Sequence, residues 1–145
     1  MRDVDGPPGE DPSLDELLME SARALRRQWA SGLGPDLSPH DARALRVVGR
    51  HGPTRLGVVA EHLRIAPRSA TDVVDRLELR GLVTRAPDPD DRRAMTVVLT
   101  DEGRAVLAEV DEARRRAGAA FFGVLGERDR ATLARLLARL DAGSR

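Results

Sequence analysis

The sequence predicts a mainly helical protein with one small β-ribbon, in the order α-α-α-α-β-β-α-α. Three observations lead to this fold class. Apolar residues recur every three or four positions in six segments, which is the spacing of amphipathic helices. Two short β-rich runs, residues 83–86 and 95–99, flank a charged turn. The chain of 145 residues is long enough for one domain with its own hydrophobic core.

The N-terminal part of the chain is expected to contain a tail followed by one helix. Residues 1–12 carry three prolines, two glycines and several acids, a composition typical of disorder. Ser13 then opens a helix, because Glu16 three residues later completes a capping box. Apolar residues spaced by threes and fours continue to Trp29, and a Gly-Leu-Gly-Pro stretch ends the helix.

Three shorter helices and the two strands are expected to form one lobe, residues 35–100. Ser38 caps the first of these helices, and a proline follows it at the first helical position. Thr54 is expected to cap the second helix in the same way. Pro67 begins the third helix, which Gly81 ends. The arrangement of these three helices before a β-ribbon indicates a helix-turn-helix followed by a wing.

Two further helices are expected at the C-terminal end. Thr100 caps the first, with two acids in its first turn, and its apolar seam continues to Gly126. The last helix spans residues 127–140 and carries a stripe of leucines. Such apolar helices need partners in water. We therefore expect residues 13–34 and 101–142 to connect the lobes and form a dimer; packing of these helices onto the protomer's own lobe is the alternative.

Charge is distributed unevenly, although the formal net charge is zero. Residues 1–20 contain seven acids and one arginine and sum to −6, so residues 21–145 carry +6. The chain contains arginine but no lysine. The planar guanidinium of arginine can donate two parallel hydrogen bonds to a phosphate or to guanine. The absence of cysteine excludes disulfides and thiolate metal sites. No segment approaches the ~20 apolar residues of a membrane span, and no leader pattern opens the chain, so a cytoplasmic protein without membrane contact is expected.

The helix that begins at Pro67 carries candidate DNA contacts on one face. Arg68, Ser69, Asp72 and Arg76 lie opposite its apolar residues, and Thr71 lies at the border. A helix in the major groove reads bases through its N-terminal residues, and arginine can bind guanine by two hydrogen bonds. Asp72 either accepts from a cytosine amino group or orients one of the arginines; we favour orientation. A solvated face of an ordinary amphipathic helix is the alternative.

The charged turn between the strands supports the DNA-binding interpretation. Three acids at positions 88, 90 and 91 precede Arg92 and Arg93. Asp91 is expected to hold Arg93 by a charge-assisted bond and to aim it outward. An arginine at the tip of a β-ribbon suits a narrow minor groove, where the negative potential is enhanced. Taken alone such a turn is common, but here it follows a helix-turn-helix.

Several motifs carry a family resemblance over residues 38–103. They are Leu37-Ser38-Pro39, Leu56-x-x-Val59-Ala60-x-x-Leu63, Val74-Asp75-Arg76-Leu77-Glu78-x-x-Gly81-Leu82-Val83, and Asp88-Pro89-x-Asp91-Arg92-Arg93-Ala94 through Leu99-Thr100-x-x-Gly103. Together they resemble the winged helix-turn-helix of the MarR family of bacterial transcriptional regulators. The flanking helices extend the resemblance over nearly all of residues 13–142.

The resemblance implies an intertwined homodimer on palindromic double-stranded DNA. In the family, the first and last helices form the dimer and the fourth helix enters the major groove. The wing arginine, which matches Arg93 here, enters the minor groove. Many members are repressors that a small phenolic or anionic ligand releases, and the ligand cleft lies between the dimer helices and the DNA-binding lobe.

Candidate ligand contacts follow from that position of the cleft. Trp29, the only tryptophan, either lines the cleft or packs in a core. Arg46, Arg50 and His51 are candidates to receive an anionic ligand, or else face solvent or phosphate. No metal site is expected, because His40 and His51 lie about 16 Å apart along one helix, too far for one ion with bonds of ~2 Å.

We therefore expect a dimeric DNA-binding transcriptional regulator without a cofactor. Repression of its own or a neighbouring promoter, with release by a small-molecule effector, is the more frequent habit in the family. A winged-helix module that binds another protein without specific DNA binding is the alternative. The sequence contains no nucleophile motif, no glycine-rich phosphate loop and no paired carboxylates, so an enzyme is not expected.

Overall fold

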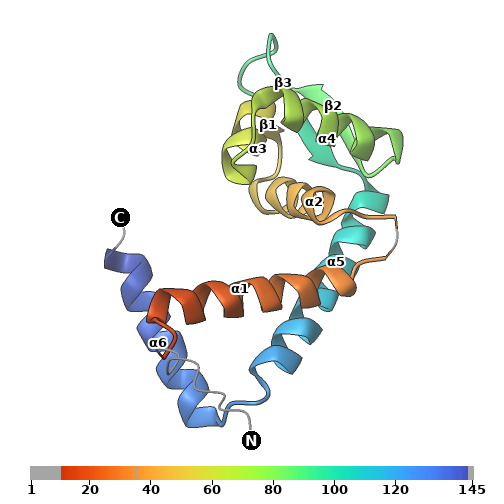
Figure 1. The fold of residues 1–145 in the computed structure, drawn as a ribbon. Helices are drawn as coiled ribbons and strands as arrows, with labels where there is room; N and C mark the ends of the chain where they lie inside the picture. Colours follow the sequence, from red (N-terminus) through yellow and green to blue (C-terminus); the bar gives the residue numbers. More distant parts are fainter. Residues whose placement is uncertain (1–10, 35, 144–145) are drawn as a thin grey trace, which may run out of the picture.

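The computed structural model describes residues 11–34 and 36–143, and its elements fall into a compact lobe and an open arrangement of long helices (Figure 1). The predicted tail, residues 1–12, lies almost entirely outside the described residues. The elements are α1 (Leu14–Ser31), α2 (Pro39–His51), β1 (Thr54–Arg55), α3 (Leu56–Leu63), α4 (Pro67–Leu79), β2 (Val83–Pro87), β3 (Met95–Leu99), α5 (Asp101–Phe122) and α6 (Glu127–Gly143). This mainly helical architecture with a small sheet confirms the predicted fold class.

Local sequence signals set the helix starts. The hydroxyl of Ser13 accepts the N–H of Glu16, and the Glu16 carboxylate accepts the N–H of Ser13 at 2.9 Å, which completes the predicted capping box. Ser38 and Thr100 each accept the N–H of the residue three positions later, at 3.1 and 3.0 Å. These bonds satisfy backbone donors that the first helical turn leaves unpaired.

The helix ends follow glycine positions. Helix α4 ends at Leu79, and Gly81 follows with a φ of +72°. Residues other than glycine rarely adopt this backbone conformation. Helix α5 ends at Phe122, four residues before the predicted stop at Gly126, because Gly123 already forms its C-terminal cap. Helix α5 is therefore shorter than predicted, and a loop still separates it from α6.

The sheet is antiparallel in the order β1-β3-β2, and it contains one strand more than predicted. The prediction that Thr54 caps α3 is wrong. Thr54 pairs with Val97 of β3, and its hydroxyl donates to the carbonyl of Gly52 at 2.6 Å. Helix α3 therefore begins at Leu56 without a side-chain cap. The pairing with β3 holds the backbone extended where the local sequence favours a helix start.

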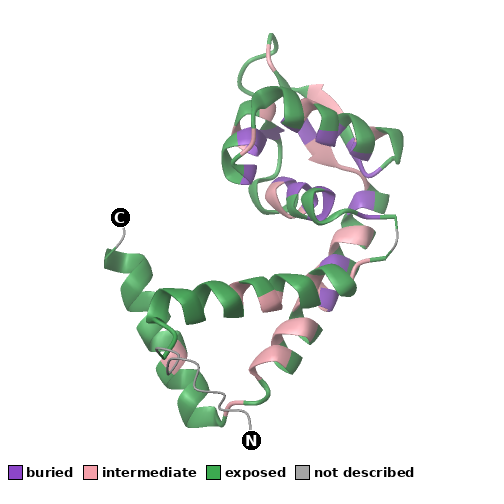
Figure 2. Ribbon diagram, viewed as in Figure 1, coloured by how far each residue is buried: buried purple, intermediate pink, exposed green. Residues whose placement is uncertain are grey.

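The hydrophobic core lies inside the lobe, between the sheet and helices α2, α3 and α4 (Figure 2). Its most deeply buried large side chains are Leu45, Val48, Val59, Leu63, Val74, Leu77 and Val83. Helices α1 and α6 contain no buried residue among those described, and they leave large apolar side chains in solvent. These include Leu14, Leu17, Leu18, Leu136, Leu137 and Leu140. None of the described helices is long and apolar enough to cross a bilayer.

Candidate nucleic-acid interface

Helix α4 presents its predicted polar face to solvent. Ala70, Val73, Val74 and Leu77 are buried against the lobe, as their spacing predicts. Arg68, Ser69 and Asp72 are exposed on the other side. Thr71 is half-buried, and its hydroxyl donates to the carbonyl of Pro67 at 3.1 Å, which leaves its methyl group and an oxygen lone pair for other contacts.

Arg76 is held by an acid from another helix. Its guanidinium donates to Oδ1 of Asp41 at 2.8 Å, and the Asp41 side chain is only 7% exposed. The hydrogen bond to Asp41 raises the pKa of Arg76, and Asp72 adds only a more distant electrostatic attraction. The sequence favours Asp72 as the acid that orients an arginine, but Asp41 of α2 orients Arg76 instead. Asp72 therefore keeps its carboxylate oxygens available on the outer face of α4.

The wing tip is fixed by two aspartates. Asp88 is nearly buried and accepts from Nε of Arg55 at 2.6 Å and from the N–H of Asp90 at 2.9 Å. The N–H of Asp90 and then the Arg55 guanidinium lower the pKa of Asp88 from its ordinary value of 3.8. Asp91 accepts the backbone N–H of Arg93 at 3.1 Å and so fixes the turn. The prediction that Asp91 holds the guanidinium of Arg93 is wrong.

Three candidate arginines keep their guanidinium groups unpaired. Within the described residues, the side chains of Arg68, Arg92 and Arg93 form no hydrogen bond or ion pair. Arg68 lies at the start of α4, whereas Arg92 and Arg93 lie at the wing tip. All three are exposed. Cationic donors are thus available both on α4 and at the wing tip of the same lobe, which is the arrangement needed to contact two grooves of DNA.

The sequence interpretation missed two arginines that shape this face. Arg55 fixes the wing tip through Asp88, and Arg85 of β2 pairs with Asp75 and Glu78 of α4. The spacing of Asp75 and Glu78 places both acids on one side of the helix, which is a signal for a shared cationic partner. The sequence does not identify that partner, because the geometry of the turn after α4 determines which residue of β2 lies against these two acids.

A cleft of about 630 Å³ lies between the long helices and the lobe. Trp29 of α1 and Arg46 of α2 both line it, together with Asp111 and Arg114 of α5. The Arg114 guanidinium lies 3.7 Å from the centre of the Trp29 ring, and Arg46 pairs with Asp111 at 2.9 Å. Partial burial lowers the pKa of Arg114, and the nearby Arg46 acts in the same direction. Nε1 of Trp29 is buried without a hydrogen-bond partner among the described residues.

The other two candidate ligand contacts lie elsewhere. Neither Arg50 nor His51 is among the residues that line the cleft beside Trp29. The His51 ring stacks on the ring of His62, with 4.5 Å between the centroids. No cluster of three or more metal-binding side chains occurs in the described part of the chain.

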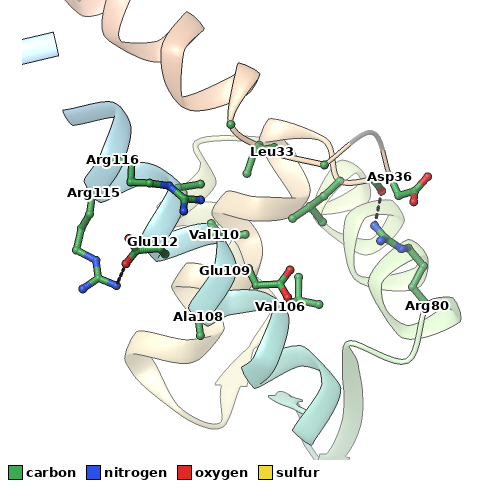
Figure 3. Close-up of a pocket in the computed structure, with 14 residues that line it drawn as sticks. Leu33, Asp36, Arg80, Val106, Ala108, Glu109, Val110, Glu112, Arg115 and Arg116 are labelled. Carbon is green, nitrogen blue, oxygen red and sulfur yellow. Dashed lines mark hydrogen bonds and ion pairs between the residues drawn. The ribbon is translucent and has the colours of Figure 1, made fainter. Parts of the chain in front are cut away.

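A second hollow, of about 740 Å³, lies along α5 (Figure 3). It is bounded by the α1–α2 connection, Arg80 and successive turns of α5. Arg80 donates to the carbonyl of Asp36, and Arg115 pairs with Glu112. Its lining mixes both signs of charge with apolar side chains such as Leu33 and Val106. The hollow meets α4 only at its C-terminal cap, Arg80, and no residue of the wing lines it.

The helix-turn-helix with a paired wing defines a winged-helix DNA-binding protein. A sequence model described as the MarR family matches residues 36–94. The transcriptional repressor MdtR of Bacillus subtilis is 30% identical over 104 residues, which cover 72% of this chain and 67% of MdtR. The chain belongs to the MarR family. It is a DNA-binding transcriptional regulator and not an enzyme, as the sequence predicts.

Solved structures agree with this assignment. A probable transcriptional regulator from Pseudomonas aeruginosa is 32% identical, with a TM-score of 0.73 over 90% of this chain and 98% of that one. BpsR of Bordetella bronchiseptica is 25% identical, with a TM-score of 0.74 over 94% of this chain and 98% of that one. The latter structure is described as showing regulation of DNA binding by 6-hydroxynicotinic acid.

Proposed function

We propose that this regulator is a dimeric repressor that binds a palindromic operator at its own or a neighbouring promoter. Arg68, Ser69 and Thr71 at the start of α4 contact base edges or phosphates in the major groove. Arg93, with Arg92 beside it, enters the minor groove. The observation that carries the proposal is that Arg68 of α4 and Arg92 and Arg93 of the wing tip are exposed and unpaired within the described residues.

The remaining candidates take supporting parts. Asp72 is exposed on the same face as Arg68 and is free to accept from a cytosine amino group. Arg76 is half-exposed, so it retains donors for a phosphate while Asp41 fixes its direction. Asp91 shapes the turn that presents Arg93. Residues 35–100 thus form the DNA-binding lobe in this proposal, and residues 13–34 and 101–142 form the dimer. A cytoplasmic location follows from the requirement for chromosomal DNA.

The dimer is supported by the exposed leucines of α1 and α6. Leu14 is 86% exposed and Leu140 is 60% exposed, and neither helix buries a residue within the described protomer. Each buried leucine contributes about 1.5–3 kcal/mol, so a second copy that covers these helices is strongly favoured. Sedimentation at increasing protein concentration measures the oligomeric state. A monomer that persists at micromolar concentration would contradict the proposal.

The cleft beside Trp29 supports a small anionic effector. It carries more guanidinium than carboxylate charge, and the buried Nε1 of Trp29 is a donor without a partner in the described part of the chain. An anion with a planar ring would accept from this donor and from Arg46 or Arg114. We do not include Arg50 and His51, which lie outside the lining. Because Trp29 is the only tryptophan, its fluorescence reports ligand binding directly.

The function is tested with purified protein and the DNA upstream of its own gene. Binding is titrated with salt and compared with scrambled DNA of the same length. The proposal expects tight, sequence-selective binding that weakens steeply with salt, because arginines displace counterions from phosphates. Weak binding that ignores sequence would favour the protein-interaction alternative.

Two variants locate the contacts. Arg93→Ala should weaken binding by roughly 1–3 kcal/mol, and unchanged affinity would remove the wing from the interface. Arg68→Ala should relax the base preference at one position of each half-site. An equal loss for all sequences would instead make Arg68 a phosphate contact.

A further inference from the structure

Arg85 connects β2 of the wing to helix α4. It is the third residue of β2, and its guanidinium donates to Oδ1 of Asp75 at 2.5 Å and to Oε2 of Glu78. The backbone N–H of Arg85 also donates to Oε1 of Glu78 at 3.1 Å. Arg85 is 29% exposed, so its bonds are partly shielded from water. One strand residue is therefore attached to two acids that lie one turn apart on α4.

The position of these bonds matters for the geometry of the wing. Between α4 and β2 the chain has only a short turn, in which Gly81 has a positive φ. From Arg85 to Asp88 at the start of the tip, an extended strand covers about 10 Å. A swing of about 15° at Arg85 would move the tip by roughly 2.6 Å, which is enough to break a hydrogen bond. Because β2 and β3 are paired along their length, an attachment at Arg85 acts on both strands of the wing and so contributes to where the tip lies.

We propose that Arg85 is a positioning residue that sets the distance between the major-groove contacts of α4 and the minor-groove contact of the wing. The inference rests on the proposed DNA interface. Arg85 does not contact DNA in this proposal. It acts on Arg93 by holding β2 against the flank of α4, so that binding of one groove places the wing over the next.

The positioning role and simple electrostatics predict opposite effects on DNA affinity when Asp75 and Glu78 are neutralised. Asp75 and Glu78 are half-exposed carboxylates on the helix that carries Arg68. Near a phosphate backbone each carboxylate opposes binding. If they did nothing else, their neutralisation would tighten binding. If they hold Arg85 and thereby the wing, their neutralisation weakens binding, and the sign of the change separates the two accounts.

The experiment is a double-variant cycle read by anisotropy of labelled operator DNA. Arg93→Ala is measured in the wild-type protein and in the Arg85→Ala background. We expect a loss of roughly 5–150-fold in the wild type and less than about threefold in the Arg85→Ala protein. Arg68→Ala is the matched control, because Arg68 lies on α4 itself. Its loss should be equal in both backgrounds within about twofold.

Two further variants address folding and charge. Arg85→Lys keeps the charge but cannot bridge both acids, so it should show a weaker form of the same coupling if Arg85→Ala unfolds. The Asp75→Asn, Glu78→Gln protein should bind more weakly than wild type at a temperature well below the thermal midpoint of both proteins. Tighter binding of that protein, or an Arg93→Ala loss that is the same in every background, would overturn the positioning role. Unchanged binding of both Arg93→Ala and Arg68→Ala in the wild type would instead refute the DNA interface itself, and the positioning role with it.

Discussion

Gly103 of α5 is the glycine at which an added methyl group should lower the free energy of unfolding most. A Cβ at this residue would lie 1.8 Å from the carbonyl oxygen of Leu82, against the roughly 3.5 Å that non-bonded heavy atoms need. Leu82 is not free to move, because its N–H donates to Leu77 at 2.9 Å and its carbonyl accepts from Thr100 at 3.1 Å. Gly103→Ala must therefore displace α5 or break the bond between Leu82 and Thr100.

The magnitude follows from three terms. Overpacking costs about 1–3 kcal/mol, and loss of the Thr100–Leu82 bond costs about 1 kcal/mol. Alanine gains about 1 kcal/mol over glycine as a helix former. The expected result for Gly103→Ala is a loss of roughly 1–3 kcal/mol in the free energy of unfolding, measured by urea titration with far-UV circular dichroism.

Gly118 provides the matched control on the same helix. A Cβ there meets no described atom within 4 Å, so Gly118→Ala should leave stability unchanged or raise it by up to about 1 kcal/mol. A second control is the exposed Gly57 of α3, which is also open. If Gly103→Ala unfolds at the same urea concentration as these controls, the argument from close backbone approach is refuted.

The remaining predictions concern the ion pairs of the lobe. Arg76→Ala leaves the buried Asp41 carboxylate unpaired and should lower the unfolding free energy by about 1–3 kcal/mol; Arg68→Ala, which breaks no contact, should stay within about 0.5 kcal/mol in the same urea titration. Equal losses would contradict the pairing. The lowered pKa of Asp88 means that its ionised form stabilises the fold above its ordinary pKa of 3.8, and that this contribution is lost as pH falls through the folded value. The thermal midpoint of Asp88→Asn should therefore lie below that of wild type at neutral pH, and the gap should close in acid; a gap independent of pH would argue against the ionic contribution.

Features that depend on near neighbours in the sequence could be predicted. The caps at Ser13, Ser38 and Thr100 need a polar residue and a backbone N–H three positions later, and all three form. Thr54 has the same local pattern as a cap, yet it lies in a strand because β3 pairs with it. The local pattern favoured a cap, but pairing with a distant part of the chain outweighed it and the prediction is wrong.

The partners of the charged side chains could not be predicted for the same reason. The sequence suggests acids three or four residues away, such as Asp72 for Arg76 and Asp91 for Arg93. The structure supplies Asp41 for Arg76 from a different helix, and it uses Asp91 for a backbone N–H. Which face carries Arg68 was predictable, because helical periodicity alone decides it.

The ion pairs explain how a chain without net charge can present the cationic face that we propose for DNA binding. Within α4 and the wing, carboxylates hold Arg76 and Arg85, whereas Arg68, Arg92 and Arg93 keep their full donor capacity. The paired arginines lose freedom to neutralise phosphate but gain fixed positions. In the proposed interface, unpaired arginines lie at the start of α4 and at the wing tip, and the paired arginines set the distance between these two points. If the proposed interface and the positioning role of Arg85 hold, this regulator selects DNA by the spacing of its two grooves as well as by base identity.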